Sequence, residues 1–306
     1  MNLKEAGKIV VQRTAQNPIG WTVYKACGRI ADYFGRVHGH ARFVRETSER
    51  DETLRKETEK LCPELTVTGG PFTGMRYPTA RSYGSALLPK LLGSYEFELH
   101  STLEALLVND YTAMVDIGCA EGYYAIGFGR RCPRTKIYAF DTSSDARAIG
   151  SDMARLNGVE ERVQIGGFCD EKMLRSIPLG ERSLIFSDCE GYEGVLFTRE
   201  VAALLAKHDV VIEAHDFIDI DLSIRMREVF DATHRIQPIK STDDIEKAHT
   251  YVVPQLRSYD TKAKRLIPGG KASRDYGMAG DDAAVMRPVS ALPVVLRRLA
   301  PQGACG

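Results

Sequence analysis

The pattern of apolar and polar positions changes character along the chain. Between Tyr24 and Val44, apolar residues recur at spacings of three and four, which predicts an amphipathic helix. Residues 45–60 alternate in charge and predict a solvated helix. We therefore expect residues 1–94 to form a helical extension that caps the main domain. A dimerisation arm and a substrate lid are the alternative roles for this extension.

From residue 111 onward, short apolar runs alternate with helical patterns. This alternation predicts an α/β fold with a parallel sheet covered on both faces, and a ligand beyond the carboxyl ends of the strands. We expect the core to span residues 95–255, followed by a loop-rich C-terminal extension, 256–306, with a short strand or helix near 283–299. The expected strands are 112–117, 136–140, 162–166, 182–188, 208–214, 233–239 and 249–253, and the expected helices are 122–131, 144–157, 191–206 and 219–231.

A run of small residues follows the first of these strands. The strand carries Asp116 near its end, and Gly118, Ala120 and Gly122 then fall on alternate positions. Small residues there let the backbone approach a ligand, and the N-terminus of the next helix points N–H groups at it. A turn that serves packing alone is the alternative. We expect a nucleotide-like cofactor to be bound by Asp116, Gly118, Ala120, Glu121 and Gly122.

An acid and a loop extend this candidate cofactor site. Asp141 ends the second strand 19 residues past Gly122, and an acid about 20 residues on from a glycine turn can bind two ribose hydroxyls. The alternative role for Asp141 is to cap the helix that begins at 144. After the third strand, Phe168 is a candidate to stack on an adenine and Asp170 to accept from its amino group. An ordinary surface loop is an equal alternative there.

Acids and a histidine follow the fourth and fifth strands, whose carboxyl ends should meet at one edge of the sheet. A neutral histidine is a usable base near pH 7, so His215 is the candidate general base, with Asp188 or Glu190 orienting it or the acceptor. A Mg²⁺ or Mn²⁺ site is the second route, since Asp188, Glu190, Glu213 and His215 offer oxygen and nitrogen ligands. The narrower ligand set is Asp188, Glu213 and His215, and the metal-free route is slightly preferred.

These motifs together resemble those of the FkbM-type methyltransferases in the class I S-adenosylmethionine (SAM) superfamily. The resemblance implies a Rossmann-like, doubly wound, mostly parallel seven-stranded sheet, SAM as cofactor, and O-methylation of a small molecule, sugar or natural product. Asp188 would then also contact the cofactor. Two features depart from the family: Asp141 stands where the family often has Glu, and His215-Asp216 follows Glu213. The matching pieces are 115–124, 138–141, 188–193 and 211–213.

Composition narrows the classes of function. Lys+Arg and Asp+Glu both number 41, which argues against a broad nucleic-acid footprint and hence against an RNA methyltransferase. The seven cysteines form no C-x-x-C pair, so no zinc knuckle is expected, and their odd number favours reduced cytosolic thiols. Residues 1–21 have no apolar core long enough for a signal peptide, and no run approaches the roughly 20 residues of a membrane span. A cytoplasmic location is therefore expected.

Three functions compete on this basis. The first is SAM-dependent methylation of a small-molecule or glycan acceptor by an enzyme that could form homodimers through its N-terminal arm. The second is an NAD-dependent oxidoreductase, which the absence of G-x-G-x-x-G disfavours, because Cys119, Ala120 and Glu121 separate the two glycines. The third is a SAM-binding protein without catalytic activity.

Overall fold

The computed structural model describes residue 22 and residues 51–216, 218–242, 244–261, 264 and 292–298. The chain divides into two compact units, Met1–Thr53 and Leu54–Gly306. The second unit contains every element discussed below. The helix expected between Tyr24 and Val44, and the arm proposed for dimerisation, lie outside the described residues.

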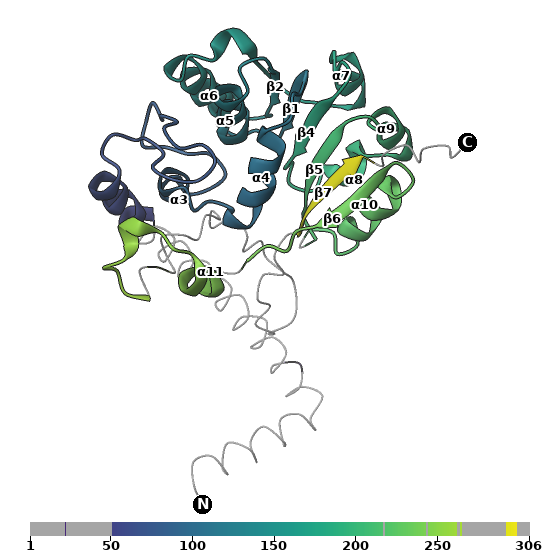
Figure 1. Ribbon diagram of the computed structural model, residues 1–306. Helices are drawn as coiled ribbons and strands as arrows, with labels where there is room; N and C mark the ends of the chain where they lie inside the picture. Colours follow the sequence, from purple (N-terminus) through teal and green to yellow (C-terminus); the bar gives the residue numbers. More distant parts are fainter. Residues whose placement is uncertain are drawn as a thin grey trace, which may run out of the picture. The chain divides into compact units, whose positions relative to one another are not determined.

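One mixed sheet forms the centre of this unit, with strand order β3-β2-β1-β4-β5-β7-β6 (Figure 1). Five neighbouring strands, β3, β2, β1, β4 and β5, run parallel, and β7 lies antiparallel between β5 and β6. The expected parallel-sheet α/β class is therefore confirmed. The strands are β1 (Ala113–Ile117), β2 (Lys136–Phe140), β3 (Val163–Gly166), β4 (Ser183–Ser187), β5 (Asp209–Ala214), β6 (His234–Pro238) and β7 (Leu292–Arg298).

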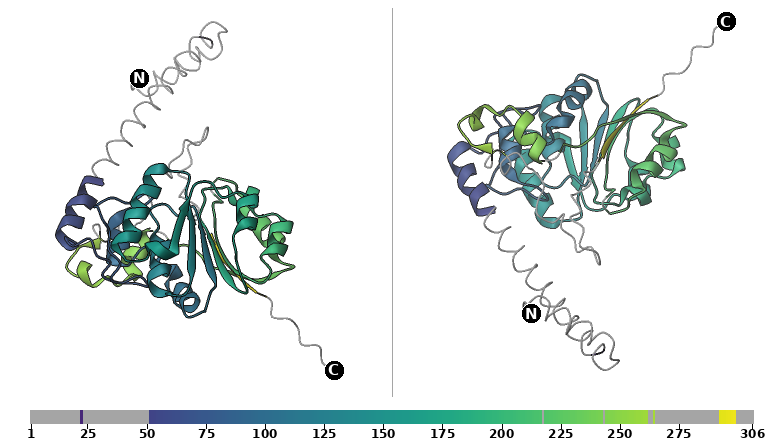
Figure 2. Two further views of the ribbon diagram at one scale, coloured as in Figure 1. Left: turned by 90° about the horizontal axis from the view of Figure 1, so that it is seen from above. Right: turned by 90° about the horizontal axis from the view of Figure 1, so that it is seen from below.

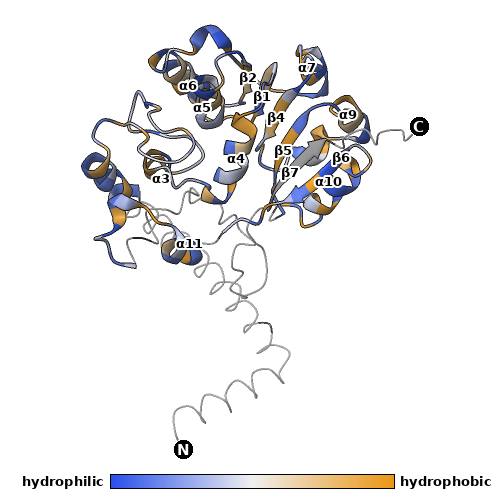
Figure 3. Ribbon diagram, in the orientation of Figure 1, coloured by the Kyte–Doolittle hydropathy of each residue, from blue (hydrophilic) through white to orange (hydrophobic). Residues whose placement is uncertain are grey.

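Helices cover both faces of the sheet because successive strand residues point to opposite sides. Met114 and Leu184 pack with α4 (His100–Leu107), α5 (Tyr123–Arg131) and α6 (Ser144–Leu156) in one core cluster. Their neighbours in sequence, Val115 and Ile185, belong to a second cluster on the opposite face. Figure 2 shows the sheet edge-on, with helices on both of its faces. Figure 3 shows hydrophobic and hydrophilic residues on different sides of α4 and of α10 (Leu222–Phe230). The second cluster packs α7 (Glu171–Ser176), α8 (Glu193–Leu196), α9 (Arg199–Leu204) and α10 (Leu222–Phe230).

Two expected elements differ from the structure. The helix expected over 191–206 is divided into α8 and α9, because Phe197 and Thr198 leave helical geometry and Thr198 caps the second helix. The strand expected at 249–253 is wrong: α11 (Asp244–Thr250) occupies the start of this stretch, and η3 (Pro254–Leu256) follows it. Only part of this apolar run is buried: Val253 joins the first core cluster with Leu256, whereas Val252 is 74% exposed.

Residues 54–94, which we expected in the N-terminal extension, belong to the same unit as the sheet. A helix runs through 54–61, and α3 (Leu87–Leu92) and η1 (Phe97–Leu99) follow. Phe72 is fully buried against α5, where a Cβ on Gly127 would lie 2.4 Å from the Phe72 ring. Between the two helices, buried apolar residues such as Val67, Phe72 and Met75 lie outside regular elements, so no periodicity in the sequence indicated their burial. No helix among the described residues has the length and apolar character needed to cross a bilayer.

Gly118 makes the closest backbone approach in the sheet region. Its φ is +82°, and a Cβ there would lie 1.7 Å from the carbonyl oxygen of Asp188, whereas Gly158 has φ +65° with open space around it. In both alanine variants, a residue with a Cβ must adopt positive φ, which costs about 1–2 kcal/mol. Only in Gly118→Ala would the new Cβ also clash with the Asp188 carbonyl oxygen. We expect Gly118→Ala to lower the free energy of unfolding by about 2 kcal/mol more than Gly158→Ala in urea titrations. Equal losses would show that the approach to Asp188 is not a constraint.

Candidate functional site

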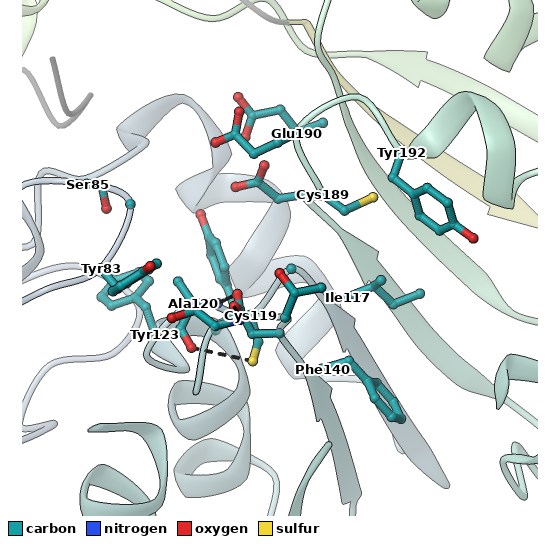
Figure 4. A pocket seen from close by; sticks show the side chains of 18 of the residues that line it. Tyr83, Ser85, Ile117, Cys119, Ala120, Tyr123, Phe140, Cys189, Glu190 and Tyr192 are labelled. Atoms are coloured by element: carbon teal, nitrogen blue, oxygen red, sulfur yellow. Dashed lines mark hydrogen bonds between the residues drawn. The ribbon is translucent and has the colours of Figure 1, made fainter. Parts of the chain in front are cut away.

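A cavity of about 640 Å³ lies at the carboxyl ends of the parallel strands. Ile117 of β1, Phe140 of β2 and Glu213 of β5 line it, as does Asp188, which follows β4. Figure 4 shows Tyr83 and Ser85 reaching the cavity from one side, and Cys189, Glu190 and Tyr192 from the other. The volume is in the range of natural ligand sites, about 300–1,000 Å³. The cavity therefore has room for a cofactor and part of a second ligand.

The turn after β1 is joined directly to Asp141. The amides of Gly118 and Cys119 both donate to the Phe140 carbonyl at 2.9 Å. Ala120 adopts φ +48°, and its amide donates to Asp141 Oδ2 at 2.8 Å, while the Ser143 amide donates to Oδ1 at 2.8 Å. Ala120 and Asp141 both line the cavity. Asp141 thus presents a carboxylate whose orientation is set by two backbone N–H groups.

Four of the residues expected at the cofactor do not line the cavity: Asp116, Glu121, Gly122 and Asp170. Asp116 is buried and accepts from the Ala125 amide at 3.0 Å, which ties β1 to the first turn of α5. Gly122 is the N-cap of α5 with φ +88°. Asp170 caps α7 through the Met173 amide at 2.7 Å. These four residues stabilise the turn and helices around the cavity, and they do not line it.

Glu121 forms a buried ion pair with Lys90, with Nζ–Oε1 at 2.6 Å and side-chain exposures of 0% and 3%. Burial alone would raise the pKa of Glu121, but Lys90 and the hydroxyl of Ser82 outweigh it and hold the pKa below its usual value. The Tyr83 amide also donates to Glu121 Oε2 at 2.9 Å. This pair therefore holds segment 82–90 against the turn and brings Tyr83 to the cavity.

His215 lies between two carboxylates. Its Nε2 is 3.3 Å from Asp188 Oδ1 and its Nδ1 is 3.1 Å from Glu193 Oε1, and the ring is 3% exposed. Burial lowers the pKa of His215, but hydrogen bonds and charge from both carboxylates outweigh this and raise it to about 11. An imidazolium cannot accept a proton near pH 7, so this geometry disfavours the general-base role expected for His215. Glu190 is peripheral, with Oε2 at 3.8 Å from Nε2 and its side chain 72% exposed.

The three residues expected as metal ligands do come together. Asp188, Glu213 and His215 each offer one ligand atom, and these atoms lie within 4.8 Å of one another. Carboxylate oxygens suit Mg²⁺ and Mn²⁺, whereas an imidazole ligand is more typical of Zn²⁺, Fe²⁺ and Ni²⁺. A divalent cation would have to displace the proton from His215, because metal-ligating imidazole is neutral. Asp188, Glu213 and neutral His215 could therefore hold a divalent cation once His215 has lost its proton.

Glu96 is a cavity residue that sequence reasoning missed. It has φ +45°, and its carboxylate accepts a short hydrogen bond from the Tyr124 hydroxyl. Burial and the charge of Glu213 raise its pKa to about 7, although Tyr124 and Tyr95 oppose the shift. No motif or spacing in the sequence around Glu96 singles it out as a site residue. In the structure η1 begins only at Phe97, which leaves Glu96 in a loop facing the cavity.

Aromatic residues complete the opposite wall. Phe168 lines the cavity with 55% of its surface exposed, and its ring centroid lies 5.0 Å from that of Tyr192. Exposed aromatic faces of this kind are suited to stacking on a planar ligand. Phe168 therefore presents an exposed ring to the cavity, and its stacking on an adenine stays a prediction.

No family model and no curated protein sequence matches the chain. Among solved structures, the O-methyltransferase TomG of Streptomyces achromogenes is similar at 12% identity over 66% of this chain and 78% of that one, with a TM-score of 0.39. Precorrin-6Y C5,15-methyltransferase of Geobacter metallireducens has 14% identity over 65% and 86%, with a TM-score of 0.39. The corresponding C-terminal domain from Rhodobacter capsulatus has 12% identity over 65% and 85%, with a TM-score of 0.37. Likeness at this level assigns no activity to this chain.

The Lys90–Glu121 pair should dominate the stability of the cavity wall. Lys90→Met leaves an uncompensated carboxylate in the interior, which we expect to lower the free energy of unfolding by about 3–5 kcal/mol. Arg134→Met is the matched control, because Arg134–Asp110 has Nη2–Oδ2 at 2.5 Å but side chains 79% and 73% exposed. That variant should lose far less stability in the same urea titration, because water and salt screen an exposed ion pair. Similar losses for both would contradict the importance of burial here.

Proposed function

We propose that the chain is a SAM-dependent methyltransferase, of the FkbM type that its motifs resemble, acting on a hydroxyl group of a small molecule, sugar or natural product. The observation that carries the proposal is the position of the Asp141 carboxylate. It lies on the wall of the same cavity as Asp188, after β4, and Glu213, near the end of β5. A candidate ribose-binding acid and candidate proton acceptors thereby line one cavity.

The cofactor end would be formed by the β1 turn and Asp141. Ala120 and Gly118 let backbone approach the ligand, Asp141 accepts from the ribose hydroxyls, and Phe168 contacts the adenine. Asp141 Oδ2 accepts one hydrogen bond from the Ala120 amide, and Oδ1 accepts one from the Ser143 amide. A carboxylate oxygen can accept two hydrogen bonds, so each oxygen can also accept one from a ribose hydroxyl. SAM supplies an electrophilic methyl group on a sulfonium centre when it is bound.

Glu96 is the residue we propose as general base for the acceptor hydroxyl. A carboxylate whose pKa is about 7 is half ionised at neutral pH and can take a proton from a weak nucleophile. His215 would act as a positioning residue, because its two N–H groups hold Asp188 and Glu193 in place. Asp188 is then free to orient the acceptor or the cationic end of the cofactor, with Glu190 at the rim.

A divalent cation on Asp188, Glu213 and His215 is the second route. Such an ion would act as a Lewis acid and lower the pKa of the acceptor hydroxyl. Titration with Mn²⁺ followed by electron paramagnetic resonance distinguishes the routes. Stoichiometric binding that Glu213→Gln abolishes favours the metal, whereas no binding up to about 1 mM leaves Glu96 as the base.

The cofactor assignment is tested by calorimetric titration with S-adenosylhomocysteine, run beside NAD. We expect micromolar affinity for S-adenosylhomocysteine alone, and at least about tenfold weaker binding by Asp141→Asn, since the ribose contact loses its charge. Asp145→Asn, at an exposed position in the first turn of α6, is the control and should bind as the wild type does. Preference for NAD, or no binding at all, would refute the methyltransferase proposal.

The base assignment predicts a pH profile. The carboxylate form of Glu96 is active, so turnover of an acceptor found by screening hydroxyl compounds should rise with pH through about 7 and then level off. Glu96→Gln should lower kcat by about 100-fold while S-adenosylhomocysteine affinity stays within about twofold.

A rise in turnover near pH 11 instead would return the base role to His215, whose pKa is about 11. Tight cofactor binding without turnover of any acceptor would favour a SAM-binding protein that does not catalyse transfer.

A further inference from the structure

A second, smaller cavity of about 190 Å³ lies where α11 meets η3 and the residues after it. Four of its nine lining residues are basic or can become so, namely Lys247, His249, Arg257 and Lys264, and none of the nine is acidic. It shares no residue with the larger cavity. We propose that this cavity is a binding site for a phosphate group.

Lys247 is the anchor of the proposed site. It is 7% exposed, and within the part of the chain that the structure describes its ammonium has no hydrogen-bond, ion-pair or aromatic partner. Burying a charged group without a partner is costly, and proteins pair such groups or use them to bind ions. The side chain nevertheless lines an open cavity, where an anion would supply the missing counter-charge.

The neighbouring charges favour phosphate over a single carboxylate. Arg257 offers a planar fork of donors that matches phosphate oxygens, and Lys247 and Lys264 add compact positive charges. A phosphate monoester carries about −1.5 to −2 charges at pH 7, so it can satisfy more than one of these cations. Glu246 and Asp260 lie close in sequence, but neither lines the cavity.

The walls of the cavity are fixed to the core of the unit. The Tyr251 hydroxyl donates to Glu98 Oε2 at 2.6 Å, and the Tyr251 ring lies 4.6 Å from that of Phe97. Leu256 is 2% exposed in the first core cluster. The basic groups are therefore held on a packed surface, as a specific anion site requires. The phosphate could be free inorganic phosphate or part of an organic phosphomonoester.

The test is a titration of the full chain with inorganic phosphate at constant ionic strength, followed by calorimetry, with glycerol 3-phosphate as a parallel arm. We expect saturable binding with one site per chain, and tighter binding in one arm identifies the source of the phosphate. Lys247→Met keeps the apolar stem and should weaken binding at least about tenfold. Lys172→Met, at an exposed position on α7, is the matched control and should not change it.

Lys264→Gln provides a second variant at a more exposed position, with an expected loss of about threefold. If a thermal melting curve shows that Lys247→Met does not fold, the phosphate affinity of Lys264→Gln tests the proposal instead. Equal affinity in the wild type and in the folded variants would overturn the proposal, as would no saturation in either arm below about 10 mM. Neither SAM nor an acceptor is present in this assay, so its result is independent of the proposed methyl transfer.

Discussion

The approach of Gly118 to the Asp188 carbonyl is the contact on which the larger cavity depends. It holds the turn after β1 against the loop after β4, and only a residue without a Cβ fits there. The same turn binds Asp141 through the Ala120 amide. Three consecutive strands of the parallel sheet, β2, β1 and β4, thus present their carboxyl ends to one volume. Side chains at these ends are brought together although they lie far apart in the sequence.

Charge balance is the second organising constraint. Five carboxylates line the larger cavity together with the imidazole of His215, namely those of Glu96, Asp141, Asp188, Glu190 and Glu213. A buried acid cluster raises the pKa of its members unless a cation compensates. Hydrogen bonding to His215 opposes this rise at Asp188 but does not cancel it, so burial still holds the pKa of Asp188 above its usual value. Glu96 receives only hydroxyl hydrogen bonds, and its pKa is raised to about 7. The proposed division of roles follows from this difference in partners.

The buried ammonium groups of Lys90 and Lys247 have different surroundings. Lys90 is paired with Glu121 and packs near the rings of Tyr95 and Tyr123, with Nζ–centroid distances of 5.1 and 5.6 Å, and it holds a wall in place. Lys247 has no such partner within the described residues and faces a cavity instead. The first arrangement stabilises structure, and the second is what a ligand site requires.

The sequence by itself determined the parallel α/β sheet, most strand positions, and the convergence of Asp141, Asp188, Glu213 and His215, because local periodicity sets the elements and parallel strands share one carboxyl edge. It could not determine which acids face the cavity. Asp116 in β1 and Glu121 in the turn after it lie close to Ala120 in sequence, but both side chains are buried in the packed interior. Only the tertiary structure decided that. It also decided that Glu96 enters the site and that His215 lies between Asp188 and Glu193, because burial and pairing depend on neighbours distant in the chain.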